Sequence, residues 1–225
     1  MITKLISKEG NNNLLIYFTG WGTTPEVVAH LAIPEGWDYL TAYDFRDLNP
    51  DDLPKLKAYD KVYLVAWSMG VCAADALASY LPKMTKAVAV NGTALPMHDQ
   101  YGIPYDIFKG TLDGLSDESR ARFNRRMCGG KKLLAVYNSF SQRSTEDLRE
   151  ELTIVYERAL QMTDDTPPNL AWTNAIVSEK DLIVPPKNQV AYWTKHHVPT
   201  YIKEGVGHYF MMEYSTWQEF LDDAR

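Results

Sequence analysis

Ser68, Asp181 and His208 are residues whose types could together support nucleophilic catalysis. A serine hydroxyl becomes a strong nucleophile when a histidine takes up its proton, and a carboxylate can then orient and stabilise the imidazole ring. The set predicts attack on an ester or another acyl carbonyl, provided that the fold brings the three side chains together.

The segment around Ser68 predicts the turn that such a nucleophile needs. An apolar run at 62–67 predicts a buried strand, and an Ala-rich run at 69–81 predicts a helix. A strand that turns directly into a helix brings the backbone close to its neighbours, so small residues are needed two positions before and after the serine. Gly70 meets this requirement, and Ala66 is one methyl larger than the usual glycine. The alternative is a serine that only caps a helix.

The base must come from one of five histidines, His30, His98, His196, His197 and His208. Only His208 follows the last predicted strand and precedes the terminal helix, and its flanking glycines let the loop turn the ring toward the sheet. His196 and His197 precede a strand, at the opposite edge, and we expect a surface pair instead of a metal site. His98 could approach the cleft without being the base.

The acid is expected just after the strand at 170–177. Asp181 lies there, in a loop that runs into two prolines, and the order Ser68, Asp181, His208 is the one found in α/β hydrolases. The alternatives are a turn aspartate without a catalytic role, and Glu179 as a weaker candidate for the acid.

Two backbone N–H groups are expected to stabilise the oxyanion. One belongs to Met69, at the start of the helix after the serine, where free N–H groups favour negative charge. The other is assigned to Trp21, in the Gly-Trp-Gly turn that follows the first predicted strand. The alternative for this turn is a glycine-rich loop with a tryptophan that only packs.

The elements that must position these residues alternate along the chain. Strands are predicted at 14–19, 38–45, 62–67, 86–92, 170–177 and 199–204. Several are apolar throughout, which is typical of parallel strands covered on both faces, and helical segments separate them. The pattern predicts an α/β fold with a mostly parallel, doubly wound sheet.

The segment at 104–165 interrupts this alternation and is predicted to be a helical insertion, or lid, over the sheet. Within it, a helix is expected near 145–162, with a capping box formed by Ser144-Thr145-Glu146-Asp147 at its start. The last helix is expected over 215–224, with Ser215 as the cap candidate. The 225 residues are expected to form one domain, 1–225, because this length encloses a single sheet with a site.

Composition narrows the function further. The net charge of −6 argues against nucleic acid or an anionic membrane as a partner. The sequence contains no run of about 18 apolar residues, so we expect no membrane-spanning helix. Cys72 and Cys128 form no disulfide framework, so the cytoplasm is the expected location. The proposed chemistry requires neither a metal nor a dissociable cofactor.

Several segments resemble one family. Tyr-Phe-Thr-Gly-Trp-Gly (17–22), the Ser68 segment (66–74), the Asn-Gly-Thr to Ile-Phe stretch (91–108) and Gly-Val-Gly-His-Tyr-Phe (205–210) are similar to the pimeloyl-carrier-protein methyl ester esterases of biotin synthesis, BioG type. The resemblance implies a compact α/β-hydrolase that frees the pimeloyl carboxylate, with the triad and oxyanion donors assigned above. The alternatives are a general short-chain carboxylesterase or thioesterase, and a non-catalytic hydrolase-like binding module.

The resemblance also implies a partner, an acyl-carrier protein bearing a methyl pimeloyl group. Carrier proteins are acidic, so an acidic enzyme needs a local basic surface to bind one. A cluster within 119–132 could provide it, and its members are Arg120, Arg122, Arg125, Arg126, Lys131 and Lys132. The alternative is a solvated helix face.

Overall fold

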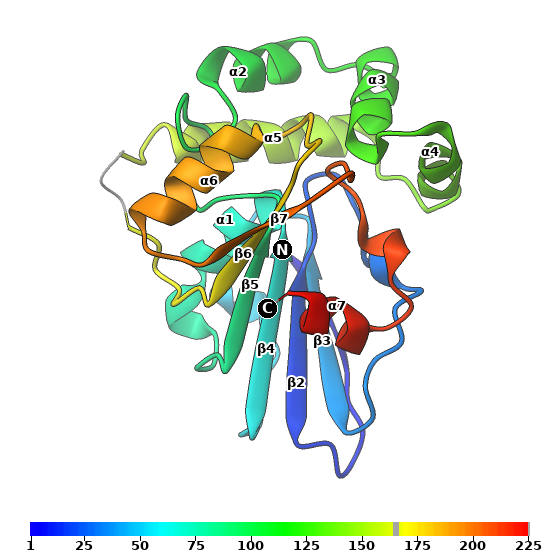
Figure 1. Ribbon diagram of the computed structural model, residues 1–225, viewed down its shortest axis with the longest axis vertical. Helices are drawn as coiled ribbons and strands as arrows, with labels where there is room; N and C mark the ends of the chain where they lie inside the picture. Colours follow the sequence, from blue (N-terminus) through cyan, green and yellow to red (C-terminus); the bar gives the residue numbers. More distant parts are fainter. Residues whose placement is uncertain (164–166, 225) are drawn as a thin grey trace.

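Among the residues that the computed structural model describes, 1–163 and 167–224, seven strands form one sheet in the order β1-β3-β2-β4-β5-β6-β7 (Figure 1). Their bounds are β1 (Ile2–Ile6), β2 (Asn13–Phe18), β3 (Trp37–Tyr43), β4 (Lys61–Trp67), β5 (Lys86–Val90), β6 (Asn174–Ser178) and β7 (Thr200–Lys203). All neighbours pair in parallel except β1, which runs antiparallel to β3. The mostly parallel sheet predicted from the apolar runs is confirmed.

Helices cover both faces of the sheet because its central strands are buried on both. In β2, Leu14, Ile16 and Phe18 belong to one apolar core, and Leu15 and Tyr17 belong to the other. This alternation follows the two-residue period of a strand. The helices α1 (Met69–Ala76) and α6 (Pro186–Lys195) pack on the first face, and α7 (Trp217–Asp223) packs on the second (Figure 1).

Four further helices between β5 and β6 lie across the carboxyl edge of the sheet (Figure 1). They are α2 (Tyr105–Asp113), α3 (Asp117–Cys128), α4 (Lys131–Asn138) and α5 (Thr145–Ala159). They occupy the predicted insertion, 104–165, of which residues 164 and 165 lie outside the described residues. A third apolar core joins α5, through Leu148 and Leu152, to Trp21 and Met69. These helices therefore form the roof of whatever site lies at the carboxyl edge.

Some boundaries differ from those predicted. The edge strand β1 was missed because Ile2 and Ile6 are exposed, so its pattern does not look like a buried strand. The strand expected at 170–177 begins at Asn174, since Leu170 N and the Trp172 indole N–H turn away to bond Asp75. Two helices end earlier than expected: α1 ends at Ala76 instead of residue 81, and α5 ends at Ala159 instead of residue 162. The helix α7 is capped by Thr216 instead of Ser215. Of the capping box predicted at the start of α5, one bond forms: Ser144 Oγ accepts from Asp147 N at 3.0 Å.

Candidate active site

Ser68 lies in the sharp turn between β4 and α1. Its φ is 55° and its ψ is −123°, a strained conformation for a residue with a Cβ. A Cβ on Gly70 would lie 2.3 Å from Thr19 O, and one on Gly92 would lie 2.3 Å from Ser68 O. Glycine is therefore required at both places, at Gly70 two residues after the serine and at Gly92 just beyond the end of β5.

Ala66 is accommodated where related motifs have glycine. It is fully buried in the apolar core on the α1 face, and it pairs with Phe18 of β2 and Ala89 of β5. Its position in a strand interior, between two ladders, means that its methyl group packs as ordinary core. The small-residue requirement before the serine is satisfied without a glycine.

The fold brings Ser68, His208 and Asp181 together at the carboxyl edge. His208 Nε2 lies 2.8 Å from Ser68 Oγ, and His208 Nδ1 lies 2.8 Å from Asp181 Oδ2. The histidine and the aspartate are 1% and 4% exposed, so their contact is shielded from water. Because the three residues follow β4, β6 and β7, their meeting is a consequence of the parallel strand order. The arrangement can move a proton from the serine to the histidine.

Asp181 is held by its own loop and by one side chain of α6. Its Oδ1 accepts from the amides of Ile183 at 2.8 Å and Val184 at 3.0 Å, and Gln189 Nε2 donates to Oδ2 at 3.0 Å. These donors leave the carboxylate one orientation, in which Oδ2 faces His208. Glu179, the weaker candidate, instead accepts from Gly205 N at 2.8 Å. Sequence reasoning did not single out Gln189.

The loop that carries Trp21 lies beside the serine. A Cβ on Gly20 would come within 3.3 Å of the Ser68 Cβ and 3.1 Å of the Trp67 ring. The Trp21 indole points into the helical roof, where its Nε1 donates to Leu148 O at 2.9 Å and its ring meets Phe123 edge-on. The loop that carries Trp21 and the first residue of α1, Met69, thus both adjoin Ser68, as the segments of two oxyanion donors would.

A narrow pocket opens above Ser68. Its volume is about 600 Å³ including the open mouth, and Ser68 and His208 lie in its wall. The rest of the wall is mostly apolar, with Ile103, Phe108 and Leu152 among its side chains. Of its described lining residues, Arg126 is the one cation. Such a wall fits an aliphatic acyl chain.

The remaining histidines and the cysteines lie elsewhere. His98 is buried outside the pocket lining, and its Nδ1 accepts from the amides of Gln100 and Tyr101. The ring of half-buried His196 packs on Tyr192, and His197 is exposed. Among the described residues, no cluster of three or more His, Cys, Asp or Glu side chains could hold a metal.

The two buried cysteines cannot supply the nucleophile at neutral pH. Burial raises the pKa of the Cys72 thiol to about 12, and it raises the pKa of Cys128 to about 12 as well. A cysteine attacks as the thiolate, so both groups are inert near pH 7. This leaves Ser68 as the nucleophile candidate at the pocket wall.

The arginines of the basic cluster do not share one environment. Arg122, Arg125 and Arg126 are exposed on α3, where Arg122 pairs with Glu118 one turn away. Half-buried Arg120 instead donates to Gln142 Oε1 at 3.0 Å and Thr145 Oγ1 at 3.5 Å. Three of the four predicted arginines are thus open to a partner, while Arg120 joins α3 to the start of α5.

The sheet, the serine turn and the helical roof define an α/β-hydrolase. The crystal structure of BioG from Haemophilus influenzae has the same fold with a TM-score of 0.88, at 40% identity over 97% of this chain and 99% of that one. The family model for the pimeloyl-ACP methyl esterase BioG matches residues 1–220. The chain therefore belongs to the BioG family, and it is a hydrolase that acts on esters.

Two further comparisons extend this result. A malonyl-[acyl-carrier protein] O-methyltransferase of Bacteroides fragilis is 40% identical over 185 residues, which make up 81% of this chain but only 36% of that protein. A lipase-esterase related protein from Clostridium acetobutylicum has a TM-score of 0.66 at 15% identity, over 99% of this chain and 98% of that one. The second likeness supports the fold alone. No described helix is both long and apolar enough to cross a membrane.

Proposed function

We propose that this enzyme hydrolyses the methyl ester of a pimeloyl group carried by an acyl-carrier protein and so frees the carboxylate for biotin synthesis. The observation that carries the proposal is the BioG family match over residues 1–220 in a chain whose Ser68 and His208 lie 2.8 Å apart in the wall of an apolar pocket. The apolar pocket wall suits an acyl chain, and the family suggests which chain it is.

The first half of the reaction forms an acyl-enzyme. His208 Nε2 takes the proton of Ser68, and the serine oxygen attacks the ester carbonyl. The negative charge that develops on the carbonyl oxygen is stabilised by the amides of Trp21 and Met69; losing one such donor typically costs about 10²–10³ in rate. His208 then returns the proton to the departing methoxide, which leaves as methanol.

The second half releases the acid. Water gives a proton to His208 Nε2 and attacks the acyl carbonyl, and collapse of the tetrahedral intermediate returns the proton to Ser68. Throughout, Asp181 keeps the His208 ring in one tautomer and stabilises the imidazolium, because its own orientation is fixed by three hydrogen bonds. None of these steps uses a metal or a dissociable cofactor.

The carrier protein is proposed to bind at α3. Arg122, Arg125 and Arg126 form an exposed basic surface on an otherwise acidic molecule, and Arg126 lines both the pocket and the groove beside it. At the end of α3, Met127 O accepts from Tyr209 N, the residue after His208, at 3.1 Å. A carrier bound to this helix would therefore deliver its acyl arm directly beside the catalytic residues.

We also propose that the reaction takes place in the cytoplasm. Cys72 and Cys128 are both free and buried, which is the usual state of cysteines in a reducing compartment. The single experiment that tests the function is mass spectrometry of the carrier-linked methyl pimelate after incubation with the enzyme. Loss of the methyl group is expected with the natural enzyme but not with Ser68→Ala.

Two comparison substrates make that experiment decisive. The thioester between the pimeloyl group and the carrier should stay intact while the methyl ester is cleaved, and a simple aryl ester should be a poorer substrate. Faster cleavage of the thioester would identify a thioesterase, and equal turnover of unrelated esters would identify a general carboxylesterase. Either result would overturn the pimeloyl assignment while keeping Ser68 as the nucleophile.

A further inference from the structure

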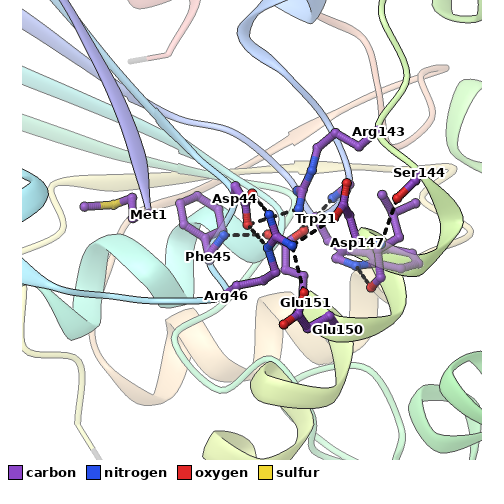
Figure 2. Close-up of polar contacts among 12 residues, drawn as sticks. Met1, Trp21, Asp44, Phe45, Arg46, Arg143, Ser144, Asp147, Glu150 and Glu151 are labelled. Carbon is purple, nitrogen blue, oxygen red and sulfur yellow. Dashed lines mark hydrogen bonds and ion pairs between the residues drawn. The ribbon is translucent and has the colours of Figure 1, made fainter.

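Glu151 is a carboxylate buried in the helical roof, with 0% of its surface exposed. It lies on α5, and its two oxygens accept hydrogen bonds from three different segments (Figure 2). Oε1 accepts from Phe45 N at 2.7 Å, and Oε2 accepts from Gly22 N at 3.3 Å and from Arg143 Nη1 at 2.6 Å. A charge buried this deeply is stable only when it is paired and hydrogen-bonded in this way.

The partner Gly22 directly follows Trp21, the proposed oxyanion donor. Gly22 has a φ of 70°, and a Cβ there would come within 3.0 Å of the Leu148 side chain on α5. The Trp21 indole donates to Leu148 O, one turn before Glu151 on the same helix. Trp21 and Gly22, two consecutive residues of the loop after β2, are thus both bonded to α5. Trp21 is bonded through its side chain and Gly22 through its backbone amide.

Arg143 compensates the buried charge from the other side. Its Nη2 forms a 3.0 Å ion pair with Asp44 Oδ1, and Arg46 joins Asp44 to α5 through Asp147 and Glu150 (Figure 2). The network fixes the start of α5 to the carboxyl end of β3. The first half of α5, which carries Glu151, is therefore tied to the sheet by several ion pairs.

We propose that Glu151 is a positioning residue for the oxyanion hole: by accepting from Gly22 N, it orients the preceding Trp21 amide toward the oxyanion. This inference rests on the proposed function in one respect: it takes the Trp21 amide to be an oxyanion donor. An oxyanion donor acts on the transition state more than on the bound ester. Weakening Glu151 should therefore lower kcat more than it raises KM.

Glu151→Gln is the direct test, because the amide keeps the size of the side chain. Its NH₂ group must replace one of the two oxygens, so it faces either Phe45 N–H or the pair of donors on Gly22 and Arg143. With a soluble aryl ester as substrate, kcat should fall about 10- to 100-fold at a nearly unchanged KM. Affinity for an alkylboronic acid, which forms a tetrahedral adduct on Ser68, should fall by a similar factor.

Asp38→Asn is the matched control. Asp38 is another carboxylate with 0% exposure, and it accepts from Ser7, Lys8, Asn11 and Tyr59. It lies near the amino end of β3, away from the site, so its variant should lose stability but keep kcat and the boronate affinity. Gly22→Ala is a second test should Glu151→Gln fail to fold: its new methyl displaces the loop against Leu148, and we expect the same loss in kcat.

The outcomes separate this inference from the proposed function. An unchanged kcat in Glu151→Gln, or a kcat loss equal to that of Asp38→Asn at equal stability, would overturn the positioning role. So would a loss confined to KM. If the natural enzyme cleaves the aryl ester but not the carrier-linked methyl pimelate, the pimeloyl assignment fails and the role of Glu151 stands.

Discussion

Asn91 donates a hydrogen bond through Nδ2 to the backbone carbonyl of His208, over a distance of 2.8 Å and a sequence separation of 117 residues. The Trp67 indole donates to the same oxygen at 3.0 Å. Asn91 has a φ of 49°, and its amide also bonds the side chain and the backbone N–H of Ser178. The position of the histidine is thus set by the ends of β4, β5 and β6, and not by its glycine-rich loop alone.

Asn91→Asp should therefore impair catalysis through His208. Aspartate keeps an acceptor for Ser178 N, but it cannot donate to the His208 carbonyl and instead repels it. We expect kcat to fall about 10- to 100-fold for every ester, because the imidazole loses its alignment with Ser68. Steady-state kinetics on an aryl ester measure this.

Asn188→Asp is the control for this variant. The buried Asn188 amide bonds the carbonyls of Asp99 and Gly102 away from the pocket, so kcat of the Asn188→Asp enzyme should be unchanged.

Gly70→Ala should destabilise the serine turn. The new methyl would lie 2.3 Å from Thr19 O and 2.6 Å from Phe18 O, so α1 and β2 have to move apart. We expect a loss of about 3 kcal/mol in the free energy of unfolding, measured with urea, together with loss of activity. Gly110→Ala on α2 is the control, because nothing lies within 4 Å of its new methyl. A Gly70→Ala enzyme as stable as this control would contradict the steric argument.

The sequence was sufficient to predict the residues that now meet at the pocket, because each of them follows a recognisable strand. Ser68, Asp181 and His208 come after apolar runs whose parallel order brings their ends to one edge. The residues that hold them were not predicted. Asn91 acts through a partner 117 residues away in the chain, and Gln189 acts through a loop whose folded shape no local pattern records. Glu151 lies among charged neighbours on a helix, so its pattern resembles that of a solvated face.

The outer elements were harder to predict for a related reason. The edge strand β1 exposes Ile2 and Ile6, and only its pairing with β3 distinguishes it from an irregular terminus. The residues at 170–172 are as apolar as a strand, yet Leu170 N and the Trp172 indole N–H bond Asp75 near the end of α1, and the bonds to β5 begin only at Thr173. In both cases a tertiary contact decides the conformation, and no local pattern records that contact.

The basic surface on α3 should distinguish carrier-linked from free substrates. Reversing Arg122, Arg125 and Arg126 to Glu is expected to raise KM for the carrier-linked ester about 10-fold or more at low salt. Because Arg126 also lines the pocket, KM for a small soluble ester should change as well, but much less. High salt should reduce the difference, because it screens the exposed charges. Kinetics on both substrates at two salt concentrations measure the effect.

The control for this triple reversal carries the same change in net charge at the far end of the sheet. Lys55, Lys61 and Lys83 are exposed there, and reversing them to Glu should leave both substrates nearly unaffected. If both triple variants raise KM equally, the effect comes from net charge and not from a docking surface. If the α3 variant loses equal activity on both substrates, the arginines act on the pocket instead of the carrier.

Asp38 should make the stability of the enzyme depend on pH in the acid range. Burial alone would raise the pKa of Asp38, but hydrogen bonds from Lys8 N, Ser7, Tyr59 and Asn11 outweigh it and hold that pKa well below its ordinary value. A carboxyl with a lowered pKa in the folded state adds stability above its unfolded pKa of about 4, and this stability is lost as the pH falls toward the folded pKa.

Asp38→Asn removes this contribution to stability at every pH. The natural enzyme should therefore exceed the variant by about 1–3 kcal/mol at pH 7, and the gap should narrow below about pH 4. Urea unfolding of both proteins at pH 7, 5 and 3.5 measures this, and a gap that stays constant to pH 3.5 would show that the bonds to Asp38 do not depend on its charge.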